Sequence, residues 1–213
     1  MRPRTLDRSG YTLVELAVAT ALFLLLMSSA VVAARGGMDA FKSSQDLSDL
    51  ETRARRALDR AVFQLVACAA SELNPNPTGP SGTENLAFRQ VVGLAGTAPV
   101  LGVPMSLAFE YGPEEANDGI DNDGNGLVDE GLLVLTRDVG GAEQRLVLCR
   151  GVREYLEGEV GDGDDDNANG LTDERGFNIQ RVGDVLFVRL SLEEPVPTGS
   201  VVRTLETAVR LRN

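Results

Sequence analysis

Two short acidic segments carry the side chains best suited to chemistry in this 213-residue chain. Residues 114–130 hold seven acids and residues 157–174 hold eight, and neither segment contains a lysine or an arginine. Both repeat one pattern of oxygen-bearing side chains, glycine and carboxylate, at a constant offset of 44 residues. Calcium binds about six to eight oxygen ligands, so this spacing indicates two cation-binding loops. Solvated acidic turns are the alternative, but repulsion among so many carboxylates would oppose their ordering.

Alternate residues of each repeat supply the expected ligands. Gly126 and Gly170 stand at the sixth position, where a sharp bend lets the preceding side chains point inward. This is the pattern of the front half of an EF-hand-type loop, in which the residue after the glycine offers its carbonyl oxygen. On this template the expected ligands are Asp121, Asp123, Asn125, Leu127 and Asp129 in the first loop, and Asp165, Asn167, Asn169, Leu171 and Asp173 in the second.

The loops depart from an EF-hand beyond this point. Position twelve, where an EF-hand has a bidentate glutamate, is Leu132 in the first loop and Gly176 in the second, and strand-like sequence follows. The repeats instead resemble the calcium loops of dockerin-like and thrombospondin type 3 repeats, which implies two bound calcium ions. The acids available to complete the two shells are Asp118, Glu130, Asp162 and Glu174. We expect weaker binding in the second loop, because it has asparagine at two inner positions.

The composition excludes several other functions. The chain contains no histidine, which removes Ser-His-Asp and Cys-His nucleophile pairs and imidazole metal ligands. Its formal net charge of −12 argues against a nucleic-acid partner, because binding to phosphates needs a basic surface. Carboxylate pairs of the glycosidase kind occur within the acidic segments, but the repeat explains them better as cation ligands. We therefore expect no enzyme activity.

An apolar segment near the N-terminus can anchor the chain in a membrane. Residues 16–34 contain no charge, and about 20 apolar residues suffice for a spanning helix. Arg2, Arg4 and Arg8 precede this segment, which predicts a cytoplasmic N-terminus and translocation of the remainder. A cleaved signal peptide is the alternative. Glu15 argues against a signal peptide, since a carboxylate within a membrane helix costs about 2.5–3.5 kcal/mol and indicates a function.

Residues 10–15 resemble the type IV prepilin signature: a short basic leader ends in glycine, an aromatic residue follows, and a glutamate stands four residues later. The resemblance implies that a prepilin peptidase cleaves between Gly10 and Tyr11 and methylates the new amine of Tyr11. It also implies that Glu15 pairs with the N-terminal amine of a neighbouring subunit during assembly. Such pairing would remove an uncompensated charge from lipid.

The expected fold is α+β, with one long N-terminal spine helix packed on an antiparallel sheet, as in the pilin fold that the resemblance implies. Its regions are a leader at 1–10, a transmembrane half of the helix at 11–35, a periplasmic amphipathic half at 36–73 and a β-rich head at 74–213. Gly36 and Gly37 predict a flexible or bent point in the helix. The expected strands are 86–92, 105–111, 132–139, 144–152, 184–192 and 201–211.

The two cysteines stand far apart in the sequence. Cys68 lies near the expected end of the helix and Cys149 on an expected strand, both on the translocated side. The periplasm permits disulfides, so a bond between them would join helix to sheet and contribute about 2–5 kcal/mol. Two buried free thiols are the alternative. We expect the disulfide.

The head adds a weaker resemblance. Residues 146–152 and 207–213 resemble parts of larger minor pilins and J-type pseudopilins. Together with the N-terminal signature, this implies a minor subunit of a type IV pilus or a type II secretion pseudopilus, with its head in the periplasm. The implied partners are other pilin subunits, the prepilin peptidase and the bacterial inner membrane. A calcium-dependent adhesin on a pilus tip is the alternative, although aromatic residues, which a ligand site would use, make up only 5% of the chain.

Overall fold

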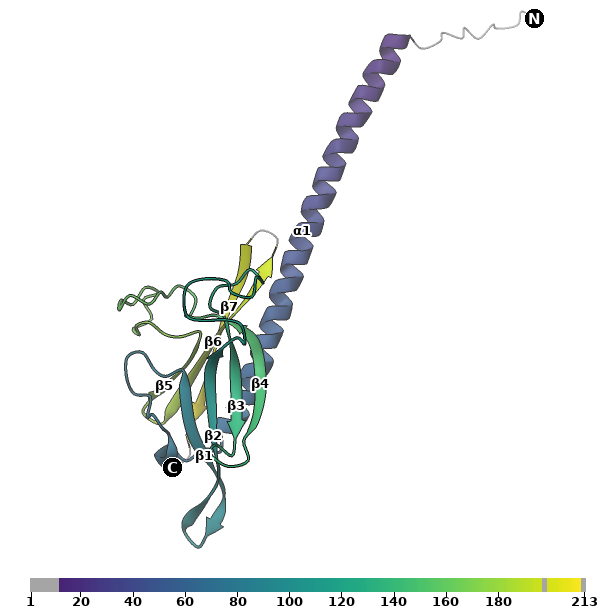
Figure 1. The fold of residues 1–213 in the computed structure, drawn as a ribbon. Coiled ribbons are helices and arrows are strands. Elements are labelled where there is room, and N and C mark those ends of the chain that lie inside the picture. Colours follow the sequence, from purple (N-terminus) through teal and green to yellow (C-terminus); the bar gives the residue numbers. More distant parts are fainter. Residues whose placement is uncertain (1–11, 197–198, 212–213) are drawn as a thin grey trace, which may run out of the picture. The chain divides into compact units, whose positions relative to one another are not determined.

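The structure, a computed structural model, describes residues 12–196 and 199–211 of an α+β protein (Figure 1). The chain divides after Gln45 into two compact units. One helix, α1 (Leu13–Leu65), contributes to both units, whereas all the strands belong to the second unit.

The first unit contains the apolar part of α1. The helix begins with a capping box, in which the Thr12 hydroxyl accepts a hydrogen bond from the Glu15 amide (3.2 Å) and the Glu15 carboxylate accepts one from the Thr12 amide (2.8 Å). The helix continues without interruption through Gly36 and Gly37, where the sequence predicts a flexible point. Its large apolar side chains are exposed, and the helix is long and apolar enough to cross a membrane.

In the second unit, residues 46–65 of α1 pack on the sheet through one face. The buried apolar side chains of this face recur at three- and four-residue intervals: Leu50, Ala54, Ala57, Leu58, Ala61 and Leu65. They join strand residues such as Phe88 and Leu107 in a single core. Burial of each leucine contributes about 1.5–3 kcal/mol, so this face fixes the end of the helix to the head.

The helix ends at Leu65, earlier than the sequence predicts. The following residues pair with strand β1 (Asn85–Ala95): the Ala69 amide donates to the Arg89 carbonyl (3.0 Å), and the Val91 amide donates to the Ala67 carbonyl (2.8 Å). A short 3-10 helix, η1 (Ala70–Glu72), comes next. Hydrogen bonds to the sheet therefore replace the last predicted turns of α1.

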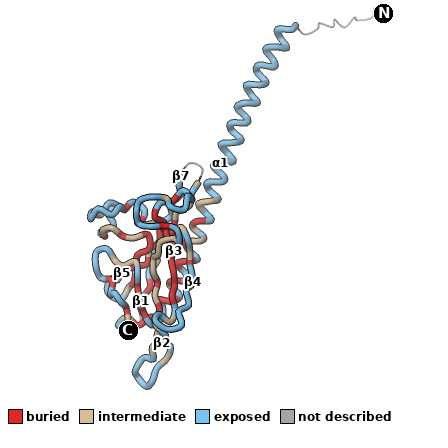
Figure 2. Tube along the Cα trace, viewed as in Figure 1, coloured by how far each residue is buried: buried red, intermediate tan, exposed pale blue. Residues whose placement is uncertain are grey.

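The described strands form one antiparallel sheet. They are β1, β2 (Ala98–Tyr111), β3 (Gly131–Arg137), β4 (Gln144–Val152), β5 (Phe177–Val182), β6 (Val185–Val196) and β7 (Gly199–Arg210). Their order is β1-β2-β3-β4-β6-β5, and β7 also pairs with β6. Thr83, just before β1, bridges to Ile179 of β5, so the two ends of this order meet. Figure 2 shows buried residues along the strands of this curled sheet.

Strand β5 is the one described strand that the sequence analysis misses. Phe177 and Ile179 are completely buried, and the strand pairs with β6 from Phe177–Leu190 to Val182–Val185. Because β5 starts directly after the second acidic segment, it fixes the position of that segment's last residues. The other strands lie where they are predicted, although β1, β2 and β6 are longer.

Candidate metal centres

Each acidic segment is a loop held at both ends by the sheet. The first acidic loop (residues 114–130) joins β2 to β3, whose facing ends pair through Tyr111 and Gly131. The second acidic loop (residues 157–174) joins β4 to β5, and Tyr155 bridges to Arg175 across its base. The sheet therefore holds the two ends of each loop together without a bound cation.

Asp121 organises the first acidic loop. Its Oδ1 accepts hydrogen bonds from the amides of Gly124 (2.7 Å) and Asn125 (3.1 Å), and its Oδ2 accepts one from the Gly126 amide (2.8 Å). Gly126 has a φ of 93°, a conformation that favours glycine, and this produces the predicted bend. The backbone thus folds around the Asp121 carboxylate.

Asp129 closes the same loop. Its Oδ1 accepts a hydrogen bond from the Asp118 amide (3.2 Å) and its Oδ2 accepts one from the Gly119 amide (2.8 Å), and Asp129 is buried. The Asp118 carboxylate in turn accepts a hydrogen bond from the Ile120 amide (3.0 Å). Both predicted ligands therefore shape the backbone of the loop.

The second acidic loop repeats these contacts. Asp165 Oδ2 accepts a hydrogen bond from the Gly170 amide (2.8 Å), and Asp173 Oδ1 accepts one from the Asp162 amide (3.0 Å). Asp173 and Asp129 both have a φ of 52°. The repeat in the sequence is therefore a repeat in structure.

Three carboxylates of the first acidic loop lie close together. One oxygen from each of Glu115, Asp123 and Glu130 lies within 4.8 Å of the other two. Glu115 is 9% exposed and Glu130 8%, whereas Asp123 is exposed, so the cluster opens to solvent on one side. Asp123 and Glu130 are among the predicted ligands, whereas Glu115 precedes the repeated pattern and is not.

Hydrogen bonds orient the two buried glutamates. Oε1 of Glu115 accepts from the amides of Asn122 (3.2 Å) and Asp123 (2.9 Å), and Oε1 of Glu130 accepts from the Asn125 side-chain amide (2.5 Å). The Oε2 atoms of Glu115 and Glu130 are buried and have no hydrogen-bond partner. Because an unsatisfied buried carboxylate oxygen is costly, this cluster suits a cation.

Glu159, Asn167 and Glu174 occupy the equivalent positions of the second acidic loop. Glu159 is 2% exposed and Glu174 is completely buried. The Asn167 amide donates to Glu159 (2.9 Å), and the Asn169 side-chain amide donates to Glu174 (2.7 Å). The second loop therefore keeps the arrangement of the first, with an amide in place of one carboxylate. It differs at Glu159, whose Oε2 accepts from the Asp173 amide (3.2 Å), so that only Glu174 of this pair keeps a buried Oε2 without a partner.

Burial raises the pKa of the last glutamate in both loops. For Glu130, desolvation is the main cause, and the negative charges of Glu115 and Asp123 raise the pKa further. For Glu174, desolvation again dominates, but the positive charge of Arg189 opposes the rise. Without a cation, burial therefore disfavours the ionised form of Glu130 and of Glu174.

The remaining predicted ligands stabilise the loops internally. The side-chain oxygens of Asn125 and Asn169 accept hydrogen bonds from the amides of Leu127 and Leu171, both at 2.8 Å. The side chains of Leu127 and Leu171 are buried. Each leucine thus anchors its loop in the head.

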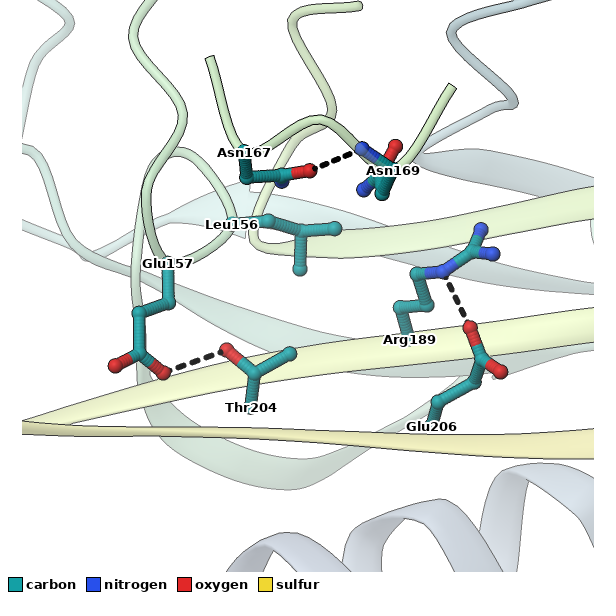
Figure 3. A pocket seen from close by; sticks show the side chains of 7 residues that line it. All are labelled: Leu156, Glu157, Asn167, Asn169, Arg189, Thr204 and Glu206. Atoms are coloured by element: carbon teal, nitrogen blue, oxygen red, sulfur yellow. Dashed lines mark hydrogen bonds and ion pairs between the residues drawn. The ribbon is translucent and has the colours of Figure 1, made fainter. Parts of the chain in front are cut away.

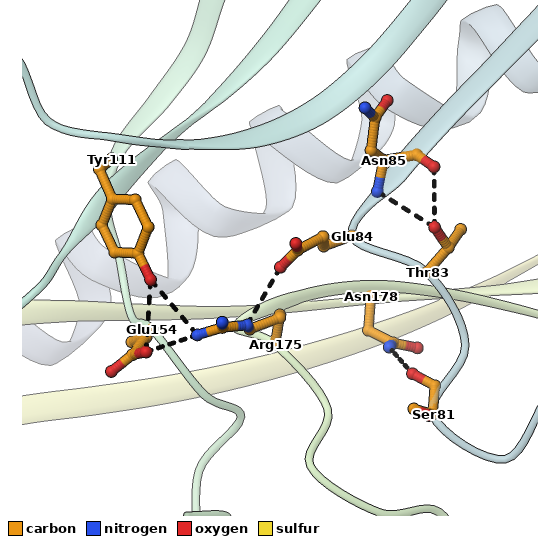
Figure 4. A network of polar contacts seen from close by, with 8 residues as sticks. All are labelled: Ser81, Thr83, Glu84, Asn85, Tyr111, Glu154, Arg175 and Asn178. Carbon is orange, nitrogen blue, oxygen red and sulfur yellow. Dashed lines mark hydrogen bonds and ion pairs between the residues drawn. The ribbon is translucent and has the colours of Figure 1, made fainter. Parts of the chain in front are cut away.

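A polar network joins the bases of the two loops (Figure 4). Arg175, directly after the second loop, donates to Glu154 (2.5 Å) and to the Tyr111 hydroxyl (3.4 Å). It also forms an ion pair with Glu84 (3.1 Å), and its guanidinium lies 4.7 Å from the centroid of the Tyr155 ring. One arginine therefore connects the start of the first loop to both ends of the second.

A pocket borders the second acidic loop (Figure 3). Its lining residues are Leu156, Glu157, Asn167, Asn169, Arg189, Thr204 and Glu206. The Thr204 hydroxyl donates to Glu157 (3.3 Å), and Arg189 pairs with Glu206 (2.6 Å). These charged side chains have partners within the pocket, so they form a structural network around the loop.

Glu15 lies in the first turn of α1. The amide and hydroxyl of Thr12 donate to its Oε2 at 2.8 and 3.0 Å. Within residues 12–196 and 199–211, no ion pair involves Glu15. The predicted cleavage site, Gly10 and Tyr11, lies outside the described residues.

The predicted disulfide is not formed, and Cys68 and Cys149 are free thiols. Cys68 bridges to Gln90 of β1, whereas Cys149 lies on β4, so β1, β2 and β3 lie between the two cysteines. Neighbouring strands are about 4.8 Å apart and four such steps separate the two cysteines along the sheet, whereas the Cα atoms of bonded cysteines lie within about 7 Å of each other. Burial raises the pKa of Cys68 to about 11 and that of Cys149 to about 12, which keeps both thiols neutral.

No family model, curated protein or solved structure matches this chain. The function is therefore inferred from the helix, the sheet and the acidic loops themselves.

Proposed function

We propose that this chain is a pilin-like subunit, a minor pilin or pseudopilin, that assembles through α1 into a filament of the bacterial envelope. Its support is a helix of membrane-spanning length whose residues 46–65 belong to the core of an antiparallel sheet. Such a helix can leave its apolar part in a membrane or in a filament while its other end holds the head. The role is structural, with no catalytic step.

The proposed orientation follows from the charges that flank the apolar segment. Arg2, Arg4 and Arg8 favour a cytoplasmic N-terminus, which places the head in the periplasm. A prepilin peptidase would then cleave between Gly10 and Tyr11 on the cytoplasmic side. The partners in the filament are other pilin-like subunits.

Glu15 is the single observation that carries this proposal. It is the only charged residue between residues 13 and 34 of α1. Thr12 satisfies its hydrogen bonds, but no described basic side chain neutralises its charge. The N-terminal amine of a neighbouring subunit would supply the opposite charge, and in a low-dielectric environment the attraction would draw two helices into register.

Calcium in the acidic loops would stabilise the head. Glu130 lies close to the carboxylates of Glu115 and Asp123, and burial disfavours its ionised form; a divalent cation would offset both effects. Because a ligand that binds only the folded state raises stability, the full-length chain in detergent should melt at a higher temperature with calcium than with chelator.

The mature N-terminus tests the assembly proposal. Mass spectrometry of the protein purified from its own bacterium should find an N-terminal, methylated Tyr11. A chain that begins within residues 28–35 would instead identify a cleaved signal peptide, and an intact Met1 would show that no processing occurs. Either result would contradict the pilin-like assignment.

A further inference from the structure

We propose that Glu115, Asp123 and Glu130 are the carboxylate ligands of a calcium ion in the first acidic loop, and that Glu159, Asn167 and Glu174 form a weaker copy of this centre in the second. This inference rests on the proposed function, in which the acidic loops bind calcium. It changes the ligand set, because the repeated sequence pattern contains neither Glu115 nor Glu159 and assigns ligand roles to Asp121 and Asp129.

The distances in the first loop match one ion. One oxygen from each of Glu115, Asp123 and Glu130 lies within 4.8 Å of the others. Calcium–oxygen distances are about 2.3–2.6 Å, so ligand atoms on opposite sides of one ion lie about 5 Å apart. A single cation between these three carboxylates can therefore reach all of them with little movement of the loop.

The hydrogen bonds single out the two buried glutamates. The exposed Asp123 uses both of its oxygens to accept from the backbone and side-chain amides of Asn125, and it joins the site through its distance to the glutamates. Both oxygens of Asp121 and both oxygens of Asp129 accept hydrogen bonds from backbone amides. Oε1 of Glu115 accepts from backbone amides and Oε1 of Glu130 from the Asn125 side-chain amide, but each glutamate leaves a buried Oε2 without a partner. Both glutamates are more than nine-tenths buried, so water does not satisfy these oxygens freely. A cation would.

The donor chemistry selects a hard ion. The cluster offers carboxylate oxygens and no sulfur or imidazole, which favours calcium, magnesium or manganese over zinc or copper. Calcium accepts an irregular shell of protein oxygens, whereas magnesium demands near-octahedral geometry and keeps most of its waters. Two buried glutamates that face one exposed aspartate suit calcium better.

The second loop should bind the same ion more weakly for two reasons. Asn167 replaces the carboxylate of Asp123 by a neutral amide, which removes one negative charge. The guanidinium of Arg189 also acts on Glu174 electrostatically and lines the same pocket as Asn167 and Asn169 (Figure 3). Of these two loops, the first should therefore fill at lower calcium concentration.

Calcium titration of the full-length chain in detergent, followed by calorimetry, tests the ligand set. The wild type should bind two calcium ions with different affinities. Glu115→Gln should weaken the tighter class by at least about tenfold, since the substitution keeps the shape but removes a ligand charge. The matched control is Glu114→Gln, which removes the same charge from the adjacent, exposed residue and should change affinity less than about twofold.

An exchange between the loops tests the proposed copy. Asp123→Asn should weaken the tighter class, and Asn167→Asp should tighten the weaker class, so the double variant should invert the order of filling. Asp123 and Asn167 lie outside the core, so these variants keep the fold even if Glu115→Gln does not. Circular dichroism checks the fold of each variant.

The outcomes separate this inference from the proposed function. If Glu115→Gln and Asp123→Asn bind calcium like the wild type while Asp121→Asn does not, the ligand set is overturned but calcium binding by the loops survives. If the wild type takes up no calcium, both proposals about the loops fail. Magnesium binding as tight as calcium binding would overturn the assignment of the ion.

Discussion

Arg175 should contribute strongly to the stability of the head, because it joins the bases of both acidic loops. Arg175→Met removes the charge-assisted hydrogen bond to Glu154 and the stacking on Tyr155 but keeps much of the side-chain volume. The side chains of Arg175 and Glu154 are only 25% and 18% exposed, so the remaining carboxylate loses its partner in a partly buried place. We expect a loss of about 2–4 kcal/mol in the free energy of unfolding.

Thermal unfolding of the full-length chain in detergent, at fixed calcium concentration, measures this loss as a fall of about 5–15 °C in melting temperature. The matched control is Arg145→Met, which breaks an exposed ion pair with Glu110 and should cost less than about 1 kcal/mol. Adding Glu154→Met to Arg175→Met should restore part of the stability, because it removes the uncompensated carboxylate. Equal melting temperatures for Arg175→Met and Arg145→Met would refute the role assigned to this network.

Two other predictions concern the loops. Ala168 has a φ of 57°, and Gly124 at the equivalent position of the first loop has a φ of 74°. Because glycine adopts positive φ at lower cost, Ala168→Gly should raise the free energy of unfolding by about 0.5 kcal/mol and Gly124→Ala should lower it by about 1 kcal/mol. Urea denaturation measures both changes, and effects of the opposite sign would contradict this explanation. Burial raises the pKa of Glu130 in the folded state. The protonated side chain therefore adds to the free energy of unfolding below the unfolded-state pKa of about 4.3, and this contribution is lost as the pH rises through the folded-state pKa. In metal-free buffer, Glu130→Gln should therefore stabilise the protein more at pH 7.5 than at pH 4.5, and saturating calcium should reverse its effect; a pH-independent difference would argue against the buried carboxylate.

The end of α1 shows a limit of local sequence patterns. Residues after Leu65 contain no proline or glycine before Pro75, so nothing local stops the predicted helix. The helix stops because Ala67 and Ala69 form hydrogen bonds with β1, whose position depends on the whole sheet. The predicted disulfide failed for a related reason, since the strand order that separates Cys68 from Cys149 is a property of the fold.

Other features were present in the sequence and could have been found. Phe177 and Ile179 alternate with polar residues, and glycines flank this segment, which is the usual pattern of a short strand. Glu115 and Glu159 are separated by the same 44 residues as the rest of the repeat. Extending the repeat a few residues towards the N-terminus would have included both. Their burial could not have been predicted this way, because it depends on packing against the head.

The repeat pattern and the apolar helix, in contrast, were accessible because their signals are local. The sixth-position glycines do adopt the conformation that the bend requires, and the stripe that includes Leu50 and Leu58 does face the sheet. What local patterns could not show was which carboxylates of the loops keep a buried oxygen without a hydrogen-bond partner. That distinction follows from individual hydrogen bonds.

The most direct test of the assembly proposal is the incorporation of Glu15→Gln into filaments. Glutamine can still cap the helix at this position, so the variant removes the negative charge while it keeps the capping box. Thr12→Ala is the matched control, because it weakens the cap and leaves the charge. In the native bacterium, with equal amounts of each variant in the membrane, Glu15→Gln should be strongly depleted from isolated filaments and Thr12→Ala should be incorporated. Incorporation of Glu15→Gln at the wild-type level would contradict the proposal that its charge drives assembly.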